Sequence, residues 1–129
     1  AARLLSGAHA MTDVTGFGLA GHLAGLCAAS GLAARVELSA LPVLQGAEAL
    51  AARGVRSALW PENVAGAGSI TGATGPRGDL LFDPQTCGGL LAAVAPDGAA
   101  ALVAALREQG HQAAIIGQLA PGAPAITCR

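Results

Sequence analysis

Residues 11–18 constrain the architecture of this chain more than any other segment, and they read Met11-Thr12-Asp13-Val14-Thr15-Gly16-Phe17-Gly18. They lead into an apolar segment whose leucines recur at helical spacing, so we expect a helix to begin at their end. The first N–H groups of a helix have no partner within it and carry partial positive charge. Glycine lets the backbone come close to a ligand. The segment therefore predicts a site for an anion.

The carboxylate of Asp13 is compatible with a neighbouring anion only if a cation is also bound. A carboxylate next to such a site repels the ligand unless a hard cation such as Mg²⁺ lies between them. The alternative is purely structural: Asp13 or Thr15 caps the helix, and Gly16 and Gly18 only shape a turn. Both interpretations are open at this point.

Composition indicates one domain over residues 1–129. The chain is 53% hydrophobic and 12% charged, with a net charge of −1. A domain this apolar is expected to have part of its surface covered by a partner or by another domain. No apolar run approaches the roughly 20 residues that span a bilayer, so we expect no membrane partner.

All seven basic residues are arginines, and they are scattered along the chain. With one Trp, two Phe and no Tyr, the chain lacks the basic stripe and stacking surfaces typical of nucleic-acid binding. Because no lysine is present, metal ions or residues from outside the chain would have to neutralise a polyphosphate.

Three cysteines without paired spacing fit a reducing, cytoplasmic compartment better than a disulfide framework. No Cys-x-x-Cys pattern is present, so a zinc site is not expected. Cys27 falls on the apolar face of the first helix and is expected in the core. The chain begins within a sequence pattern and without Met, which we interpret as a piece of a longer protein.

Hydrophobic periodicity and Gly or Pro breakers predict a mixed order of helices and strands. Residues 57–78, rich in Gly with two Pro, are expected to form a mobile loop around a short helix at 61–64. Asp97 is placed to cap the last helix. This order predicts a layered α/β domain of the α+β type, with one mixed β-sheet packed with helices. The expected helices are the end of one at 1–8, then 19–30, 44–53 and 98–109, and the expected strands are 34–38, 80–82, 90–95, 113–119 and 125–128.

A competing motif is Gly16-x-Gly18-x-x-Gly21 with Glu37 about twenty residues on, the spacing of a dinucleotide-binding unit. A Rossmann strand should be an apolar run just before the glycines, but polar residues stand there. Too little alternating β and α structure follows Glu37. No Walker lysine follows any glycine loop either, so a P-loop is absent.

A second loop, Asp83-Pro84-Gln85-Thr86-Cys87-Gly88-Gly89, also combines an acid, a hydroxyl and terminal glycines. Alone it fits a tight turn. Together, four blocks of the chain closely resemble the C-terminal domain of the selenophosphate synthetase (selenide, water dikinase) family, whose fold is shared with aminoimidazole ribonucleotide synthetase. The blocks are His9–Leu23, Leu41-Pro42 with Gly46-Ala47, Pro61-Glu62-Asn63, and Leu80–Leu91.

The resemblance implies ATP- and Mg²⁺-dependent phosphorylation of selenide to selenophosphate, with release of AMP and phosphate. It implies that Asp13 is a metal ligand and that Thr15, Gly16 and Gly18 line the phosphate side of the site. The family's reactive Cys or selenocysteine, its lysine and its nucleotide loop lie in an N-terminal domain. This chain is therefore expected to hold no catalytic residue.

The implied partners are that N-terminal domain of the same chain, selenide, ATP and a second copy in a cytoplasmic homodimer. Three other functions stay open: a related enzyme of the aminoimidazole ribonucleotide synthetase type, a dinucleotide-binding domain, and a catalytically silent interaction domain.

Three further residues carry expectations. The family usually has Ser where this chain has Cys87, which we interpret as a small residue rather than a reactive thiol. Phe17 is expected to be a packing residue. His22 is expected to be a partly packed side chain rather than a catalytic base.

Overall fold

The core of the molecule is a four-stranded mixed sheet, seen here in a computed structural model that describes residues 1–129. The strands lie in the order β3 (Ile70–Thr71), β6 (Ile126–Cys128), β2 (Leu32–Val36) and β5 (Gly117–Pro121). β6 runs parallel to both of its neighbours, whereas β5 is antiparallel to β2. The alternating burial of β6 places Ile and Cys in the core and Thr outside, as period-2 geometry requires.

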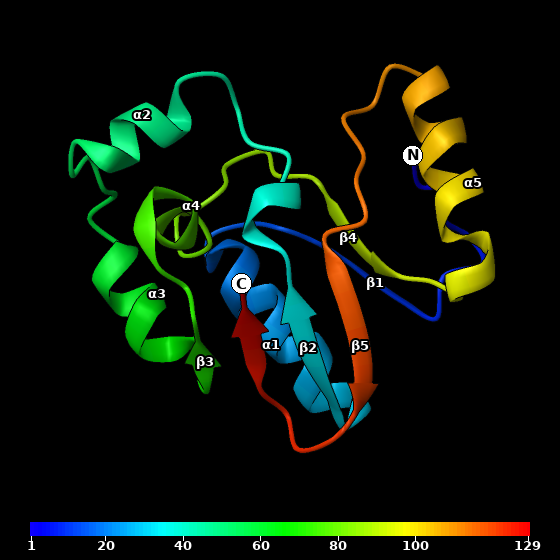
Figure 1. Ribbon diagram of the computed structural model, residues 1–129, viewed down its shortest axis with the longest axis horizontal. Coiled ribbons are helices and arrows are strands. Elements are labelled where there is room, and N and C mark those ends of the chain that lie inside the picture. The colour runs from blue at the N-terminus through cyan, green and yellow to red at the C-terminus, as the bar shows by residue number, and fades with distance from the viewer.

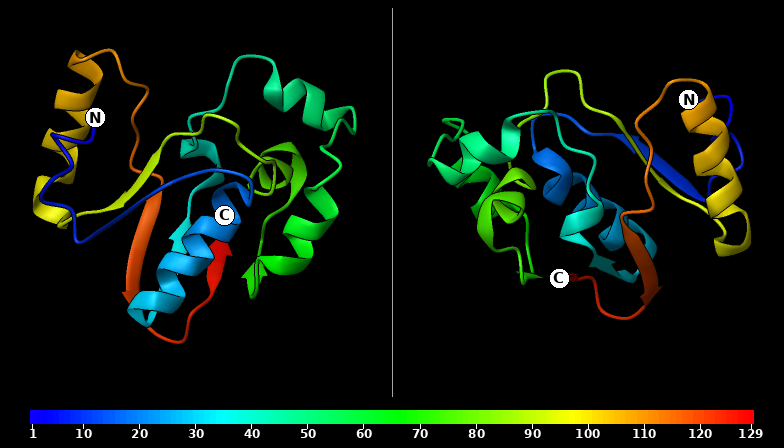
Figure 2. Two further views of the ribbon diagram at one scale, coloured as in Figure 1. Left: turned by 180° about the vertical axis from the view of Figure 1, so that it is seen from behind. Right: turned by 45° about the horizontal axis from the view of Figure 1, so that its top comes forward.

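Helix α1 (Gly18–Ser30) lies behind this sheet (Figures 1 and 2). Its sequence is apolar nearly all round, and the residues that it buries recur at helical spacing. Gly31, with φ +64°, ends the helix in the left-handed conformation as predicted. The residues that α1 and the sheet contribute to the common core include Ala20, Leu23, Cys27, Ala34, Val36, Ile126 and Cys128.

Three short helices form a separate group, beside the sheet in Figure 1: α2 (Ala47–Ala52), α3 (Trp60–Gly66) and α4 (Gly75–Leu80). The 3₁₀ turn η1 (Leu38–Ala40) connects them to β2. The short helix expected at 61–64 is confirmed as α3, but the expectation of a mobile loop around it, over 57–78, is wrong, because β3 and α4 form in the rest of this stretch.

A two-stranded antiparallel ribbon stands apart from the main sheet (Figure 1). It pairs β1 (Ala10–Asp13) with β4 (Leu90–Ala93), and Asp13 lies opposite Leu90. Helix α5 (Pro96–Glu108) follows β4 and runs beside the N-terminal segment.

The mixed α/β class was predicted correctly, but the strands form two sheets rather than one. Residues 1–8 form turns instead of a helix end, because only a single bond of α-helical spacing forms, from the N–H of Leu5 to the carbonyl of Ala1. The N-cap of α5 is Ala95 without a side-chain bond, so Asp97 lies inside the first turn and does not cap it.

Two predicted strands also differ from the structure. Residues 80–82 end helix α4 and turn, and their apolar character serves the core: Leu81 and Phe82 are both buried. Residues 113–116 are irregular, and the strand begins only at Gly117, where a side chain would collide with the carbonyl of Arg35.

The topology excludes the dinucleotide-binding alternative. A Rossmann unit needs the strands before and after the glycine helix to be parallel neighbours in one sheet. Here β1 pairs only with β4, and β2 lies in the other sheet. No helix of the structure combines the length and the apolar character needed to cross a membrane.

Candidate functional site: two joined loops

The two loops singled out in the sequence lie side by side. The β1–β4 ladder ends at the pair Asp13 and Leu90, and the N–H of Val14 continues it by donating to the carbonyl of Gly89 at 2.9 Å. One step further, the N–H of Gln85 donates to the carbonyl of Thr15 at 3.0 Å. Residues 13–17 and 83–89 thus form one joined pair of loops, which we call the paired loops.

Gly88 shows how closely the paired loops pack. A Cβ atom at this position would collide with the carbonyl oxygen of Val14 and lie 2.9 Å from Cβ of Gln85. A glycine is needed there because the backbone of the other loop fills the space that a side chain would take.

Neither Asp13 nor Thr15 caps helix α1. The N-cap residue is Phe17, and no side chain caps the helix. The purely structural interpretation of Asp13 as a helix cap is therefore wrong: three residues separate it from Phe17, and it ends a strand.

Thr15 is instead held by His22, from the second turn of α1. The N–H of Thr15 donates to Nε2 of His22 at 2.9 Å, and Oγ1 of Thr15 lies 3.1 Å from the same atom. Nε2 therefore carries a lone pair, and the proton of the neutral ring is on Nδ1. His22 is half-buried as expected, and its role is to orient Thr15.

Phe17 is not a packing residue in this structure, because 68% of it is exposed. Its ring centroid lies 5.8 Å from that of His22, and its Cβ lies close to Gly21, both in the helix that it precedes. Most of the Phe17 side chain is therefore open to solvent beside the candidate site.

The two glycines of the first loop differ. Gly16 is exposed, and a Cβ there would meet nothing within 4 Å. Gly18 is buried with φ +68°, and a Cβ there would lie 2.6 Å from the carbonyl oxygen of Leu81. Packing alone thus requires glycine at position 18, and the roles of Gly16 and Gly18 in lining a ligand stay predictions.

Asp13 is exposed, and its side chain takes part in no hydrogen bond or ion pair. Such a free carboxylate at the end of a strand fits one oxygen ligand of a hard cation. Nowhere in the structure do three His, Cys, Asp or Glu side chains gather around a possible metal position. Any metal at Asp13 would therefore need further ligands from water, substrate or another part of the protein.

Asn63, on helix α3, is bonded both to the first of the paired loops and to the residue just before the second. Its Nδ2 donates to the carbonyl of Gly16 and to that of Phe82, each at 2.9 Å. Asn63 lies within one of the blocks that resemble the family, but its sequence context predicted no role for it. The sequence held one signal for this role: Asn is a poor helix former, so an Asn inside a helix indicates that its side chain forms a specific hydrogen bond.

Comparison with known proteins places this architecture in a family. The family described as "AIR synthase related protein, C-terminal domain" matches residues 1–128. The chain belongs to this family.

Curated relatives of this AIR synthase related domain carry the name selenide, water dikinase. The protein from Burkholderia pseudomallei (strain K96243) is 46% identical over 124 residues, which are 92% of this chain and 35% of the relative. The protein from Escherichia coli (strain K12) is 44% identical over 119 residues, 91% of this chain and 34% of the relative. The chain thus spans about a third of the length of these relatives.

A solved structure confirms the fold. Thiamine-monophosphate kinase from Stenotrophomonas maltophilia K279a superimposes with a TM-score of 0.66 at 23% identity, over 97% of this chain and 33% of that one. The family match and the curated relatives confirm the recognition of a domain of the aminoimidazole ribonucleotide synthetase type.

The cysteines of this AIR synthase related domain separate into two environments. Cys27 and Cys128 are buried, and burial raises the pKa of both thiols above the ordinary value of 9.0. Cys27 is thus a core residue as predicted, and Cys128 is one as well. Cys87 is exposed in the second of the paired loops, and none of the three forms a disulfide.

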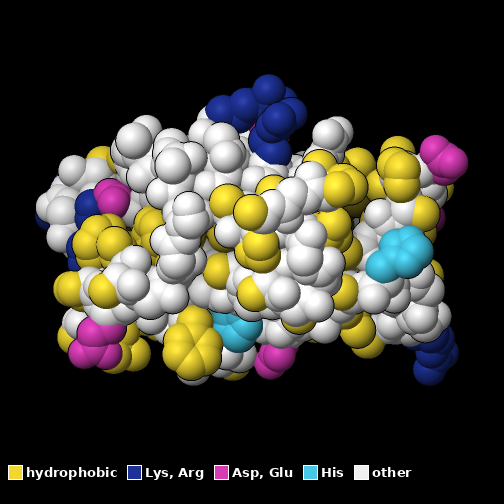
Figure 3. All heavy atoms as spheres, turned by 90° about the horizontal axis from the view of Figure 1, so that it is seen from below, with side chains coloured by type: hydrophobic (Ala, Val, Ile, Leu, Met, Phe, Trp, Pro, Cys, Tyr) yellow, Lys and Arg dark blue, Asp and Glu magenta, His cyan; other side chains and the backbone are white.

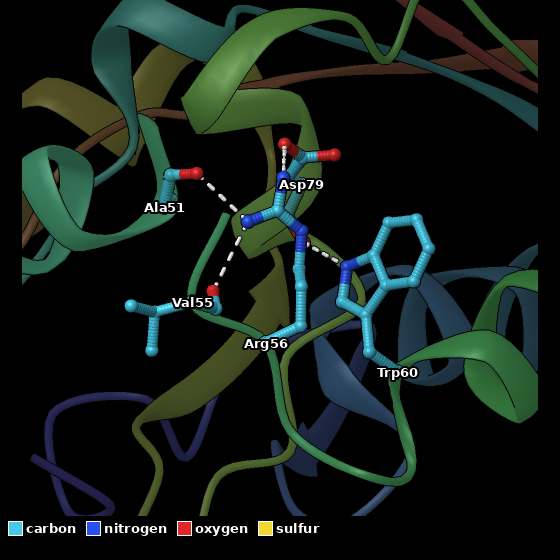
Figure 4. A network of polar contacts seen from close by, with 5 residues as sticks. All are labelled: Ala51, Val55, Arg56, Trp60 and Asp79. Atoms are coloured by element: carbon cyan, nitrogen blue, oxygen red, sulfur yellow. Dashed lines mark hydrogen bonds and ion pairs between the residues drawn. The ribbon is translucent and has the colours of Figure 1, made fainter. Parts of the chain in front are cut away.

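A network around Arg56 joins the three short helices of the domain (Figure 4). Nη1 of Arg56 donates to the carbonyls of Ala51 and Val55 at 2.7 and 3.0 Å, and Nη2 is paired with the carboxylate of Asp79. The guanidinium lies over the ring of Trp60, 5.5 Å from its centroid. A cavity of about 140 Å³ borders this network, and its wall includes Asp83.

The surface of the domain is apolar in many places. Figure 3 shows one face on which hydrophobic side chains are spread among few charged ones. Two exposed hydrophobic residues, Met11 and Phe17, lie close to Asp13 in the sequence. A third, Leu90, is paired with Asp13 across the ribbon. This agrees with the expectation that another part of the protein covers some of the surface.

Proposed function

We propose that this chain is the C-terminal domain of a selenophosphate synthetase, a cytoplasmic enzyme that acts as a homodimer. The full enzyme converts ATP, selenide and water into selenophosphate, AMP and orthophosphate, and it depends on Mg²⁺. Support comes from the curated relatives, named selenide, water dikinase at 44–46% identity over nine-tenths of the chain. The observation that carries the site is the free carboxylate of Asp13 at the end of the paired loops.

In this proposal the chain forms one wall of the reaction cleft. Asp13 supplies one ligand to Mg²⁺, and Thr15, Gly16 and Gly18 line the phosphate side, where Gly16 is the one of the three whose N–H has no partner within the protein. Mg²⁺, when bound, shields the charge of the polyphosphate during transfer. The chain has no lysine to share this task, so the N-terminal domain supplies the remaining ligands and all catalytic residues.

The test uses the full-length enzyme that carries this domain, assayed for AMP release with and without selenide. We expect AMP release to require selenide and Mg²⁺, and Asp13→Asn to abolish it. The fold should not change, because Asp13 is exposed and unbonded, so the melting temperature of the variant should equal that of the wild type.

The matched control is Asp97→Asn, which removes an exposed carboxylate from the first turn of α5. This variant should retain wild-type turnover. Full activity of Asp13→Asn would refute the metal role. AMP release without selenide would refute the proposed reaction and favour a related ATP-dependent enzyme of the same fold.

A further inference from the structure

Two neighbouring N–H groups of the first paired loop have no partner. The N–H groups of Gly16 and Phe17 form no hydrogen bond to the backbone or to a side chain. The N–H groups of the residues on either side already have partners. The N–H of Thr15 donates to His22, and the N–H of Gly18 donates to the carbonyl of Thr15 at 3.1 Å. Adjacent unpaired N–H groups beside a helix start are donors that suit an anion.

The orientation of one of these donors depends on Asn63. A peptide group is planar and trans, so its C=O and N–H point in opposite directions. The carbonyl of Gly16 and the N–H of Phe17 belong to the same peptide group, and Asn63 holds that carbonyl at 2.9 Å. Fixing the carbonyl toward α3 therefore fixes the N–H of Phe17 away from α3.

The second hydrogen bond of Asn63 fixes the Gly16–Phe17 peptide group relative to the packed residue Phe82. An amide NH₂ has two hydrogens, and those of Asn63 go to Gly16 in the first loop and to Phe82 at the start of the second. Trp60 of the same helix packs edge-on against Phe82, with ring centroids 6.0 Å apart. The peptide group is thus anchored to packed parts of the domain.

We propose that Asn63 is a positioning residue that aims the N–H of Phe17 at a phosphate oxygen of the bound nucleotide. This inference rests on the proposed function for its ligand, Mg·ATP. Asn63 itself touches neither ATP nor metal, and it acts through the Gly16–Phe17 peptide group.

The test measures the affinity of the full-length enzyme for Mg·ATP by calorimetry, together with hydrogen exchange of the loop amides. Asn63→Ala removes both bonds, and Asn63→Asp keeps the shape but places a carboxylate against two carbonyl oxygens. A hydrogen bond to a charged group accounts for about a 10- to 100-fold change in affinity. We expect a loss of about tenfold or more for Asn63→Ala and a larger one for Asn63→Asp.

Hydrogen exchange separates positioning from general destabilisation. We expect faster exchange at the amides of Thr15, Gly18 and Gln85, and unchanged exchange at Ala34 in the main sheet. The matched control is Glu62→Gln, an exposed neighbour on α3 that forms no side-chain bond, and it should alter neither measurement.

Wild-type affinity in Asn63→Asp, or equal acceleration of exchange at Ala34, would overturn the inference. Failure of the proposed function gives a different result: Mg·ATP binds to the wild type, but selenide does not stimulate its cleavage. The affinity ratio between wild type and variants then still decides the role of Asn63.

Discussion

Some glycines of this domain leave room for another segment of the protein's own backbone. The sequence suggested that the glycines after Asp13 leave room for a ligand, but Gly18 leaves room for Leu81 and Gly88 for Val14. A sequence shows that a position needs close approach, but it does not show what approaches. The approaching groups here lie more than 60 residues away along the chain, so only the tertiary structure identifies them.

The glycines of α1 give a prediction about stability. Gly18→Ala should lower the free energy of unfolding by at least about 2 kcal/mol, because the residue has φ +68° and its new Cβ would lie 2.6 Å from the carbonyl of Leu81. Gly25→Ala is the control in the same helix: it is exposed, meets nothing within 4 Å, and should stabilise by about 0.5–1 kcal/mol. Urea denaturation of both variants measures the difference, and equal effects would contradict this account.

At the scale of elements, the well-predicted segments are those with long, simple patterns. Helix α1 with its stop at Gly31 and helix α5 match the sequence prediction within one or two residues. Helix α3 was predicted at 61–64 and is longer by one or two residues at each end, whereas helix α4 was missed because its Gly and Pro were taken for loop formers. Each proline instead lies in the first turn of a helix, where no N–H is needed.

These short helices depend on side-chain bonds between elements. A helix of six or seven residues is not stable by itself. Arg56 compensates by joining the last turn of α2 to Asp79 of α4, with Trp60 of α3 beneath it (Figure 4). Arg77 acts similarly, with bonds to Glu48 at 2.9 Å and to the carbonyl of Leu38 at 3.1 Å.

Removal of Arg56 should therefore loosen this group of helices. We expect Arg56→Ala to lower the free energy of unfolding by about 1–2 kcal/mol, a modest amount because the ion pair is about one-quarter exposed. High salt should weaken the ion-pair part of the effect. Arg53→Ala, an exposed arginine without side-chain bonds, should change stability little. A loss for Arg53→Ala as large as that for Arg56→Ala would contradict the role of the network.

Across the whole molecule, the joining of the paired loops was beyond prediction from local patterns. Asp13 and Leu90 are 77 residues apart, and their pairing depends on the β1–β4 ribbon. The resemblance to a family linked the two loops in function, whereas the residues alone did not place them together. Two separate sheets were likewise unpredictable, since strand patterns do not specify which strands pair.

The titration of the domain at high pH follows from its composition. With no Lys or Tyr, the thiols are the main side chains that titrate near pH 9. Burial raises the pKa of Cys27 and Cys128 in the folded state, so above the ordinary pKa of 9.0 the unfolded chain loses protons that the folded chain retains. The contribution of these two thiols to the free energy of unfolding is full below this pH, and it is lost as the pH rises through their raised pKa values.

We therefore expect the free energy of unfolding to fall as the pH rises above about 9. Urea denaturation across this range measures the slope. Cys27→Ala should reduce this slope, because it removes one of the two buried thiols. A flat profile for the wild type would contradict the burial argument.

The position of Trp60 has a practical consequence. It is the only Trp in a chain without Tyr, so the emission excited at long ultraviolet wavelengths comes from this one indole. Its N–H donates to the carbonyl of Asp79 at 2.9 Å, and its ring packs against Phe82 and lies under Arg56. The domain thus carries a built-in optical reporter three residues from Asn63, which can follow the paired loops without any label.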